Sequence, residues 1–309
     1  MIKTLTCSIL IASSYFILLQ PKVSGNSFAT KEACEQISSQ LVVSVIDRMK
    51  NLPNIDVKIS NSGISRIILN EPNTYNALSL LTLKSLIESF KKLSDDKNTK
   101  VIIIEGSGKG FCAGHNLKEI KALKGKPNYQ KLFNLCSKLM VNIVNNNKPV
   151  IAKVHGAAFA AGCQLVASCD LALSSDKAIF ATPGVNIGLF CSTPMVAVSR
   201  NVSRKKTMKM LLTGEPITAQ YAKEIGLIND YFEDSQLEEE ILKLAEIITS
   251  KSSKVLKIGK KAFYKQLEMP LEKAYKYTSK IMTENMMAMD AREGIAAFIE
   301  KRKPNWKNK

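Results

Sequence analysis

Long apolar runs and histidine are both scarce in this chain of 309 residues. After the first 20 residues, no apolar run approaches the roughly 20 residues that a membrane span needs, which excludes a protein with several spans. Only two histidines are present, His115 and His155. No Cys/His spacing typical of zinc sites occurs, so we expect no bound metal. Internal repeats and low-complexity tracts are absent as well.

Acidic residues are also few: 27 Asp and Glu face 44 Lys and Arg, which gives a net charge of +17. A basic chain favours polyanionic partners such as nucleotides, nucleic acid or anionic membranes. The lysines are spread along the chain, however, which is equally typical of a solvated surface. With 45% hydrophobic residues, the chain can bury the core of one large domain, or of a domain with an appendage.

Residues 1–40 are interpreted as a targeting leader. A cationic start, an apolar stretch over about residues 5–19 and small residues near Gly25 fit a secretory signal. The same stretch has lysines, hydroxyl side chains and no acid before Glu32, which fits an organelle transit peptide. Four of the seven cysteines lie in Gly-rich or apolar segments and not at the spacings of a disulfide scaffold. We therefore favour the mitochondrion, with the secretory pathway as the alternative.

After the leader, predicted strands and helices alternate, which is typical of an α/β fold. Residues 57–70 predict a β-hairpin, 78–93 a helix and 101–106 a strand buried on both faces. A second buried strand is predicted at 148–156, a short helix at 162–168 and a third strand at 171–176. From 251 the chain is helical and rich in Lys and Met. We divide it into a leader (1–40), a core (41–250) and a C-terminal helical module (251–309).

Two segments share a layout that suits chemistry on the main chain. GKGFCAGHNLKEI (108–120) and HGAAFAAGCQL (155–165) place small residues between a buried strand and an apolar or amphipathic segment. Small residues let a ligand approach the backbone, and the first N–H groups of a helix point outward without an internal partner. Two such junctions facing one point would hold an oxyanion between two N–H donors. Either segment alone is better explained by close packing of helix on strand.

Five segments, in order, resemble the crotonase superfamily of enoyl-CoA hydratase/isomerase proteins over about residues 54–306. They are NEPNTYNALS, FCAGHNLKE, KPVIAKVHGAAFAAGCQLVASCDLALSSDKAIFATPGVNIG, LLTGEPITAQYAKEIGLIN and EGIAAFIEKRKPNW. The resemblance implies an α/β crotonase (ClpP-like) spiral of ββα turns with a C-terminal helical oligomerisation module. It also implies an acyl-CoA or enoyl-CoA ligand, with CoA as part of the substrate and no separate cofactor, and a homotrimer or hexamer.

The resemblance also assigns candidate site residues. The family's two oxyanion-hole amides fall on the backbone N–H groups of His115 and Ala161, where the family usually has Gly at the second position. An alanine there keeps the N–H but requires an unstrained φ. A lysine that commonly meets the CoA phosphates falls on Lys109, whereas the partner basic position is Asn73. Further positions matched to CoA contacts are Ala113 and, from a neighbouring subunit, Phe298 and Lys301.

Two catalytic glutamates of the hydratases are missing from the matched positions, which carry Gln164 and Gly184. A carboxylate can accept a proton at neutral pH, whereas an amide cannot and glycine has no side chain. We therefore expect no efficient hydration by the usual route. Gln164 could instead orient a water or bind a small anion.

Several side chains near these segments could substitute for the lost carboxylates. The imidazoles of His115 and His155 could titrate near neutral pH, although His155 fits a structural role at a strand end better. Cys191, Ser192 and Thr193 follow the second lost glutamate. Cys191 fits a buried small residue better than a nucleophile.

Three functions remain open. The first is an enzyme, a lyase by resemblance, that stabilises a thioester enolate. The second is a non-catalytic acyl-CoA-binding regulator that kept the pocket and lost the carboxylates. The third is RNA binding through a predicted stripe of lysines, although such a stripe is more typical of a solvated face; we expect no DNA partner. The stripe consists of Lys254, Lys257, Lys261 and Lys265.

Overall fold

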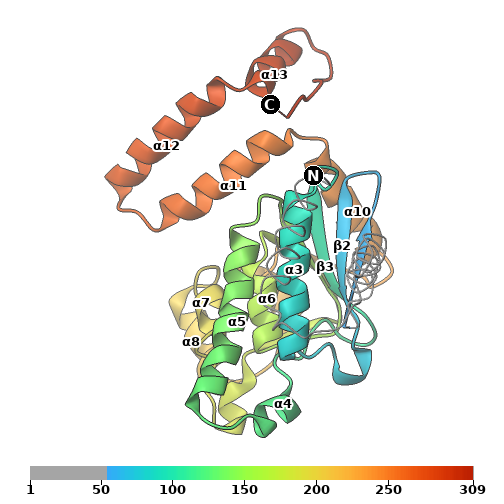
Figure 1. Cartoon of the computed structure of the whole chain (residues 1–309), viewed down its shortest axis with the longest axis vertical. Coiled ribbons are helices and arrows are strands. Elements are labelled where there is room, and N and C mark those ends of the chain that lie inside the picture. Colours follow the sequence, from blue (N-terminus) through green and yellow to red (C-terminus); the bar gives the residue numbers. More distant parts are fainter. Residues whose placement is uncertain (1–53, 309) are drawn as a thin grey trace, which may run out of the picture. The chain divides into compact units, whose positions relative to one another are not determined.

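The computed structural model describes residues 54–308, shown as a ribbon in Figure 1. These residues belong to one compact unit. The predicted leader and the first residues of the predicted core, 41–53, lie outside the described residues. The division of the chain at residue 250 stays a prediction.

A six-stranded sheet forms the centre of the fold, with strand order β1-β2-β3-β4-β6-β9. β1 is antiparallel to β2, and the remaining pairs are parallel. A second, three-stranded sheet has the order β5-β7-β8. The strands of the first sheet are β1 (Ile55–Ile59), β2 (Ile64–Leu69), β3 (Val101–Gly106), β4 (Val150–Val154), β6 (Leu171–Ser175) and β9 (Asp230–Phe232); those of the second are β5 (Ala157–Phe159), β7 (Ile179–Ala181) and β8 (Ile217–Thr218).

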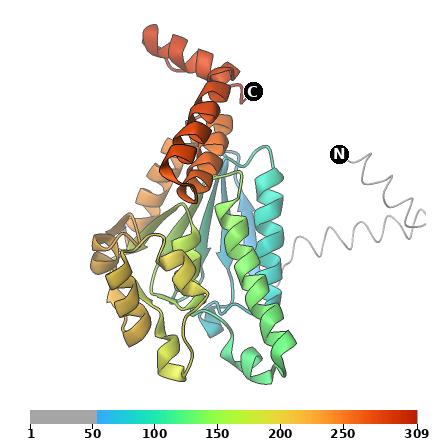
Figure 2. The ribbon, with the colours of Figure 1, turned by 90° about the vertical axis from the view of Figure 1, so that its left-hand side faces the viewer.

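Helices cover both faces of the large sheet, as Figures 1 and 2 show. Residues of α3, α5 and α6 bury one face and residues of α10 the other. The helices are α3 (Leu80–Asp95), α4 (Leu117–Ala122), α5 (Lys126–Val144), α6 (Ala161–Ser168), α7 (Pro194–Val198), α8 (Arg204–Thr213), α9 (Ala219–Glu224), α10 (Leu237–Thr249), α11 (Ser253–Leu267), α12 (Leu271–Met286) and α13 (Met289–Ile299), with 3₁₀ turns η1 (Pro72–Thr74) and η2 (Pro183–Ile187).

The β3 sequence explains the two-sided burial. Ile102 and Ile104 join the core under α3 and α5, whereas Val101 and Ile103 join the core under α10. Successive side chains of a strand point to opposite faces, so a continuous β-branched run fills both cores at once. The observed α/β fold confirms the predicted fold class.

The predicted elements are present with small shifts at their ends. The hairpin forms from β1 and β2. The helix predicted from residue 78 begins at Leu80, because the Ser79 hydroxyl accepts a hydrogen bond from the N–H of Thr82 and caps the helix. The predicted helix at 162–168 begins one residue earlier, at Ala161. Helix α5 was not predicted; its apolar positions recur at helical spacing from Leu132 to Ile143.

Helix α11 is anchored to the amino end of the sheet by a buried ion pair. The Lys260 ammonium lies 2.6 Å from the Asp170 carboxylate and also donates to the carbonyls of Ile143 and Lys148, each at 3.0 Å. The Tyr264 hydroxyl donates to the other Asp170 oxygen at 2.9 Å. Asp170 also accepts the N–H of Val150 at 2.7 Å.

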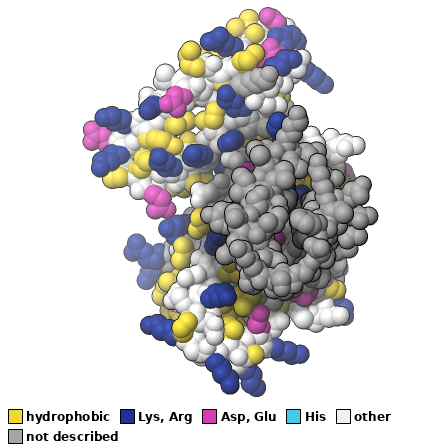
Figure 3. All heavy atoms as spheres, in the orientation of Figure 1, with side chains coloured by type: hydrophobic (Ala, Val, Ile, Leu, Met, Phe, Trp, Pro, Cys, Tyr) yellow, Lys and Arg dark blue, Asp and Glu magenta, His cyan; other side chains and the backbone are white. Residues whose placement is uncertain are grey.

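Basic side chains lie over both the core and the C-terminal helices on the face drawn in Figure 3. Lys254, Lys257, Lys261 and Lys265 all lie on α11, and Lys265 sits over the Tyr277 ring at 4.8 Å. RNA binding by this stripe stays a prediction. No helix within residues 54–308 combines the length and apolar character needed to cross a membrane.

Candidate active site

Two backbone segments meet at the carboxyl ends of β3 and β4. Residues 111–116 follow β3, and Cys112 pairs with Ala158 of β5. The N–H of Cys112 donates to the Ala157 carbonyl at 3.0 Å, and the Phe159 N–H donates to the Cys112 carbonyl at 2.9 Å. This pairing brings the segment that carries His115 beside the start of α6.

Glycines make this approach possible. A Cβ on Gly114 would lie 3.2 Å from the Ala161 nitrogen and 2.9 Å from the Phe159 carbonyl oxygen, and Gly114 has a φ of +92°. A Cβ on Gly162 would lie 2.1 Å from the Cys112 carbonyl oxygen. Side chains at these two positions would push the segments apart, so the glycines set the spacing between residues 114 and 161.

The N–H of His115 points away from its strand partner. The Leu78 N–H donates to the Gly114 carbonyl at 2.7 Å, and the Leu78 carbonyl accepts from the Asn116 N–H at 3.3 Å. Leu78 thus bonds the two neighbours of His115 and not His115 itself. In such a parallel bridge the intervening residue directs its own N–H to the opposite side. Among the residues that the structure describes, the His115 N–H therefore has no backbone acceptor and is free to meet a ligand.

Ala161 is the first residue of α6, where the N–H groups have no intrahelical acceptor. The strained residue is its neighbour: Ala160 has a φ of 48° and a ψ of −114°, and its own N–H donates to the Ala181 carbonyl. Ala161 is not among the residues with positive φ. Ala161 thus lacks the positive φ that an alanine disfavours, and the strain falls on Ala160, in a conformation that costs about 1–3 kcal/mol and is typical of functional sites.

Gln164 lies one helical turn after Ala161 and is only 3% exposed. Its Oε1 accepts the Cys136 thiol hydrogen at 3.8 Å, across from α5. Burial raises the pKa of Cys136 to about 12, so the thiol keeps its proton.

At Gly184, the second position where the hydratases carry a glutamate, the structure leaves no room for a side chain. A Cβ on Gly184 would lie 2.7 Å from the Leu189 carbonyl oxygen and 2.9 Å from Sγ of Cys191. The Gly184 N–H donates to that sulfur at 3.3 Å. Cys191 is buried, and burial raises the pKa of its thiol, which disfavours the nucleophilic thiolate.

The two histidines have different surroundings. Both ring nitrogens of His115 are buried without a hydrogen-bond partner in the described part of the chain, and the ring packs edge-to-face on Phe133 at 5.6 Å. Burial lowers the pKa of this imidazole, which keeps it neutral at pH 7. His155 instead bonds the Gly108 carbonyl through Nε2 at 2.9 Å, which fits the structural role expected for it.

The two positions matched to phosphate contacts lie on adjacent turns. A Cβ on Gly108 would meet Cβ of Pro72 at 2.5 Å, which places the turn of Lys109 against the turn of Asn73. Both side chains are exposed. Ala113 is half-buried and fixed by its N–H bond to the Tyr75 carbonyl at 2.9 Å. Lys109 is thus an exposed cation on the turn after β3.

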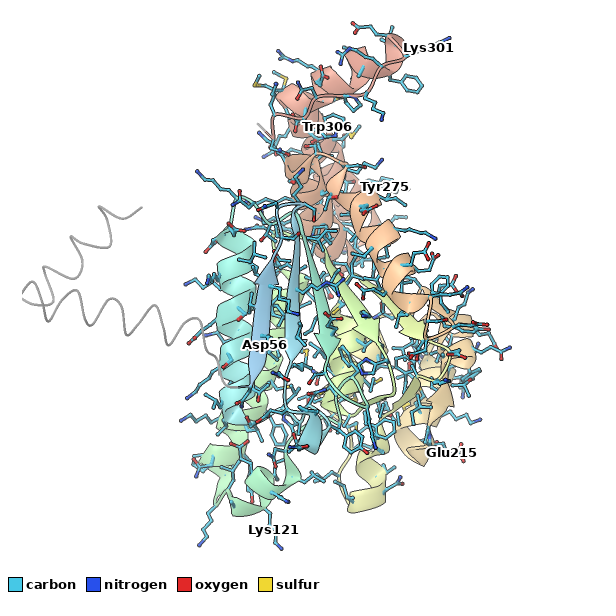
Figure 4. The ribbon with its side chains drawn as sticks, turned by 90° about the vertical axis from the view of Figure 1, so that its right-hand side faces the viewer. Asp56, Lys121, Glu215, Tyr275, Lys301 and Trp306 are labelled. Atoms are coloured by element: carbon cyan, nitrogen blue, oxygen red, sulfur yellow. The ribbon has the colours of Figure 1, made fainter. Side chains whose placement is uncertain are left out.

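Phe298 and Lys301 are at the other end of the unit. Figure 4 shows Lys301, just after α13, far from Lys121 of α4, the helix that follows the His115 segment. Phe298 lies on α13 and is 85% exposed. Within one chain these residues do not join the site, so any CoA contact would have to come from another copy.

Two groups of positioning residues were missed by sequence reasoning. Asn76 is buried, and its amide donates to the carbonyls of Ser107 and Gly110, each at 2.9 Å, which ties the Tyr75 loop to the turn after β3. Phe133 and Cys136 contact the site residues from α5. The helical spacing of apolar residues in α5 was the available signal for the second group.

The arrangement supplies backbone donors and neutral side chains. Within residues 54–308, no group of three or more His, Cys, Asp or Glu side chains could hold a metal ion. The five cysteines in this range are buried and unpaired by disulfides. Such a site can bind an oxygen that gains negative charge, but it has no carboxylate at either matched position to move a proton.

Comparison with known proteins gives a consistent assignment. A family model described as enoyl-CoA hydratase/isomerase matches residues 59–309. The human "Enoyl-CoA hydratase domain-containing protein 3, mitochondrial" is 49% identical over 79% of this chain and 80% of its own length. "Enoyl-CoA hydratase, mitochondrial" of Pongo abelii is 33% identical over 80% of this chain and 85% of its own.

Solved structures agree with this assignment. The crystal structure of human enoyl Coenzyme A hydratase domain-containing protein 3 has a TM-score of 0.80 at 48% identity, covering 82% of this chain and 100% of that one. An enoyl-CoA hydratase of Mycobacterium smegmatis has a TM-score of 0.81 at 44% identity, covering 82% and 99%.

Proposed function

Because the chain belongs to the enoyl-CoA hydratase/isomerase family, we propose that it binds an acyl-CoA thioester and polarises its carbonyl through the N–H groups of His115 and Ala161. The close approach of residues 114 and 161 is the observation that carries this proposal. Donors placed in advance stabilise the negative charge that develops on the oxygen. Removing one such donor typically costs about 3–4 kcal/mol.

The proposed activity is stabilisation of a thioester enolate without efficient hydration. Gln164 cannot act as a base, and the space beside Gly184 is filled by the segment of Leu189 and Cys191. His115 is the candidate proton carrier, since its neutral ring lies on the residue that also supplies one donor. Lys109 would hold the CoA phosphates.

The same features support a second candidate, a non-catalytic acyl-CoA-binding regulator. Both proposals place the ligand in the same site and differ only in turnover.

Location and assembly are proposed from the relatives. Several relatives with 47–50% identity have "mitochondrial" in their names, which supports a mitochondrial location for this chain. A homotrimer or hexamer would bring Phe298 and Lys301 of one copy to the site of another. Light scattering on the purified protein would measure the number of copies.

A panel of CoA thioesters tests the proposal by binding and by product analysis. We expect micromolar binding of acyl-CoA and enoyl-CoA, and hydration of crotonyl-CoA far below ordinary hydratase rates. Hydration at ordinary rates would contradict the assigned roles of Gln164 and Gly184. Tight binding without any product would favour the regulator, and no binding would end both proposals.

A further inference from the structure

Helix α11 carries side-chain charge of one sign only. Its 15 residues, Ser253–Leu267, include several lysines and no aspartate or glutamate. One of these lysines, Lys260, is buried and paired with Asp170. The others follow one another at helical spacing and therefore project from one side of the helix. We call them the lysine row: Lys254, which is half-buried, and the exposed Lys257, Lys261 and Lys265.

The lysine row is not neutralised within the described part of the chain. On α10, by contrast, the exposed Lys243 lies 2.7 Å from Glu239. Among residues 54–308, the salt bridge of α11 is that of Lys260, and the row forms none. Glu268, which follows the row, lies 3.5 Å from Arg200. Like charges three or four residues apart destabilise a helix, so a row that keeps this repulsion suits a negatively charged partner outside the chain.

Helix α12 adds cations to the same side. The Lys265 ammonium lies over the Tyr277 ring at 4.8 Å, so Tyr277 faces the lysine row. Residues three or four positions from Tyr277 share its side of α12, and two of them, Lys273 and Lys280, are exposed lysines. Lys280 lies 3.8 Å from Glu284. The helix pair therefore presents a broad basic side, on which one lysine of α12 is paired.

The chemistry of this side favours a lipid surface over a nucleic acid. Single-stranded nucleic acids are commonly held by cations together with aromatic rings on which the bases stack. The exposed ring of Phe263 lies two residues from both Lys261 and Lys265, about 200° around the helix, so it faces away from the row. The Tyr277 ring is covered by Lys265. An anionic membrane needs only basic side chains near its surface.

We propose that the lysine row, together with Lys273 and Lys280, binds the surface of an anionic phospholipid membrane. The contact is electrostatic and peripheral, so salt weakens it by screening. It is separate from the candidate active site, because Lys260 anchors α11 at the amino edge of the sheet and the candidate site lies at the carboxyl edge.

Vesicle binding by the full chain tests this assignment. Co-sedimentation is measured with vesicles of phosphatidylcholine alone and of phosphatidylcholine mixed with phosphatidylglycerol, at low and at high salt. We expect binding only to the mixed vesicles and its loss at high salt. Each lysine replaced by glutamine should weaken binding about fivefold. The row variant, in which Lys254→Gln, Lys257→Gln, Lys261→Gln and Lys265→Gln are combined, should lose more than about a hundredfold.

A matched control removes the same charge at the opposite end of the unit, where Figure 4 shows Lys121. It combines four exposed lysines changed to glutamine, Lys118, Lys121, Lys124 and Lys126, and should bind the mixed vesicles within about threefold of the wild type. An equal loss in the control, equal binding to both kinds of vesicle, or full binding by the row variant would overturn the proposal. If the row variant does not fold, the single variants Lys257→Gln and Lys261→Gln decide.

A single-stranded RNA serves as the competing probe. RNA binding that exceeds vesicle binding and disappears in the row variant would assign the row to nucleic acid and overturn the lipid assignment. Binding to neither RNA nor mixed vesicles would also overturn it and leave the row as a solvated face.

Discussion

The two edges of the parallel sheet use polar groups in opposite ways. At the amino edge, the Asp170 carboxylate is fully engaged by Lys260, Tyr264 and the Val150 N–H. At the carboxyl edge, the His115 ring nitrogens have no partner in the described chain, and Ala160 is strained. Satisfied buried groups hold the fold together, whereas strained and unsatisfied ones gather where α/β sheets bind ligands. The amino edge is therefore where we expect substitutions to affect stability most, and the carboxyl edge is where we propose the function.

The largest effect is expected from breaking the amino edge. Lys260→Met leaves Asp170 buried without its counter-charge and removes the donor to two carbonyls, which we expect to cost about 3–5 kcal/mol in the free energy of unfolding. Denaturant titration measures this. Lys261→Met, at the exposed next position, should change the free energy by less than about 0.5 kcal/mol. Equal effects of the two variants would show that the ion pair is not an anchor.

At the carboxyl edge, Gly162→Ala should act on both stability and binding. The added Cβ would lie 2.1 Å from the Cys112 carbonyl oxygen, so we expect a loss of about 1–3 kcal/mol and weaker acyl-CoA affinity. The control is Gly259→Ala in α11, where a Cβ meets nothing within 4 Å. That change should stabilise the helix by about 0.5–1 kcal/mol. An unchanged acyl-CoA affinity in Gly162→Ala would argue against the proposed spacing between the His115 and Ala161 N–H donors.

The closed position at Gly184 can be tested by a double-mutant cycle. Gly184→Ala places a Cβ against Cys191, so the cost should shrink when Cys191→Ala removes the sulfur. We expect a coupling of about 0.5–3 kcal/mol between the two changes, measured by thermal or denaturant unfolding. Additive effects would mean that the sulfur does not fill this space. By the same reasoning, Gly184→Glu alone should not raise crotonyl-CoA hydration.

The smallest effect concerns the pH dependence of stability. Burial lowers the pKa of His115 below its ordinary value of 6.5. Above pH 6.5 the ring is neutral in both states; as pH falls below 6.5, the unfolded ring binds a proton that the folded ring does not, so stability falls. His115→Phe should remove this part of the acid sensitivity, at most about 1.4 kcal/mol per pH unit. Free energies of unfolding at pH 7.5 and 5.5 measure it; parallel pH curves would contradict it.

Sequence reasoning located the site segments but not the helix that packs over them. Strand β3 and the glycine junctions were predictable, because β-branched runs and small residues have local physical meaning. Phe133 and Cys136 were missed, since α5 contributes them from the middle of an amphipathic helix whose pattern says only that one face is buried. Asn76 was missed because its role depends on the turn after β3, which lies more than 30 residues away in sequence.

By itself the sequence determined which chemistry is present: two small-residue junctions, an amide and a glycine where carboxylates were expected, and α/β alternation. The junctions and the alternation follow from residue type and spacing, whereas the two carboxylate positions come from the resemblance to the family. Only the tertiary structure decided that Cys191 occupies the space beside Gly184, that the thiol of Cys136 contacts Gln164, and that Asp170 anchors α11. Such contacts join residues distant in sequence, and close packing of the whole core sets their distances.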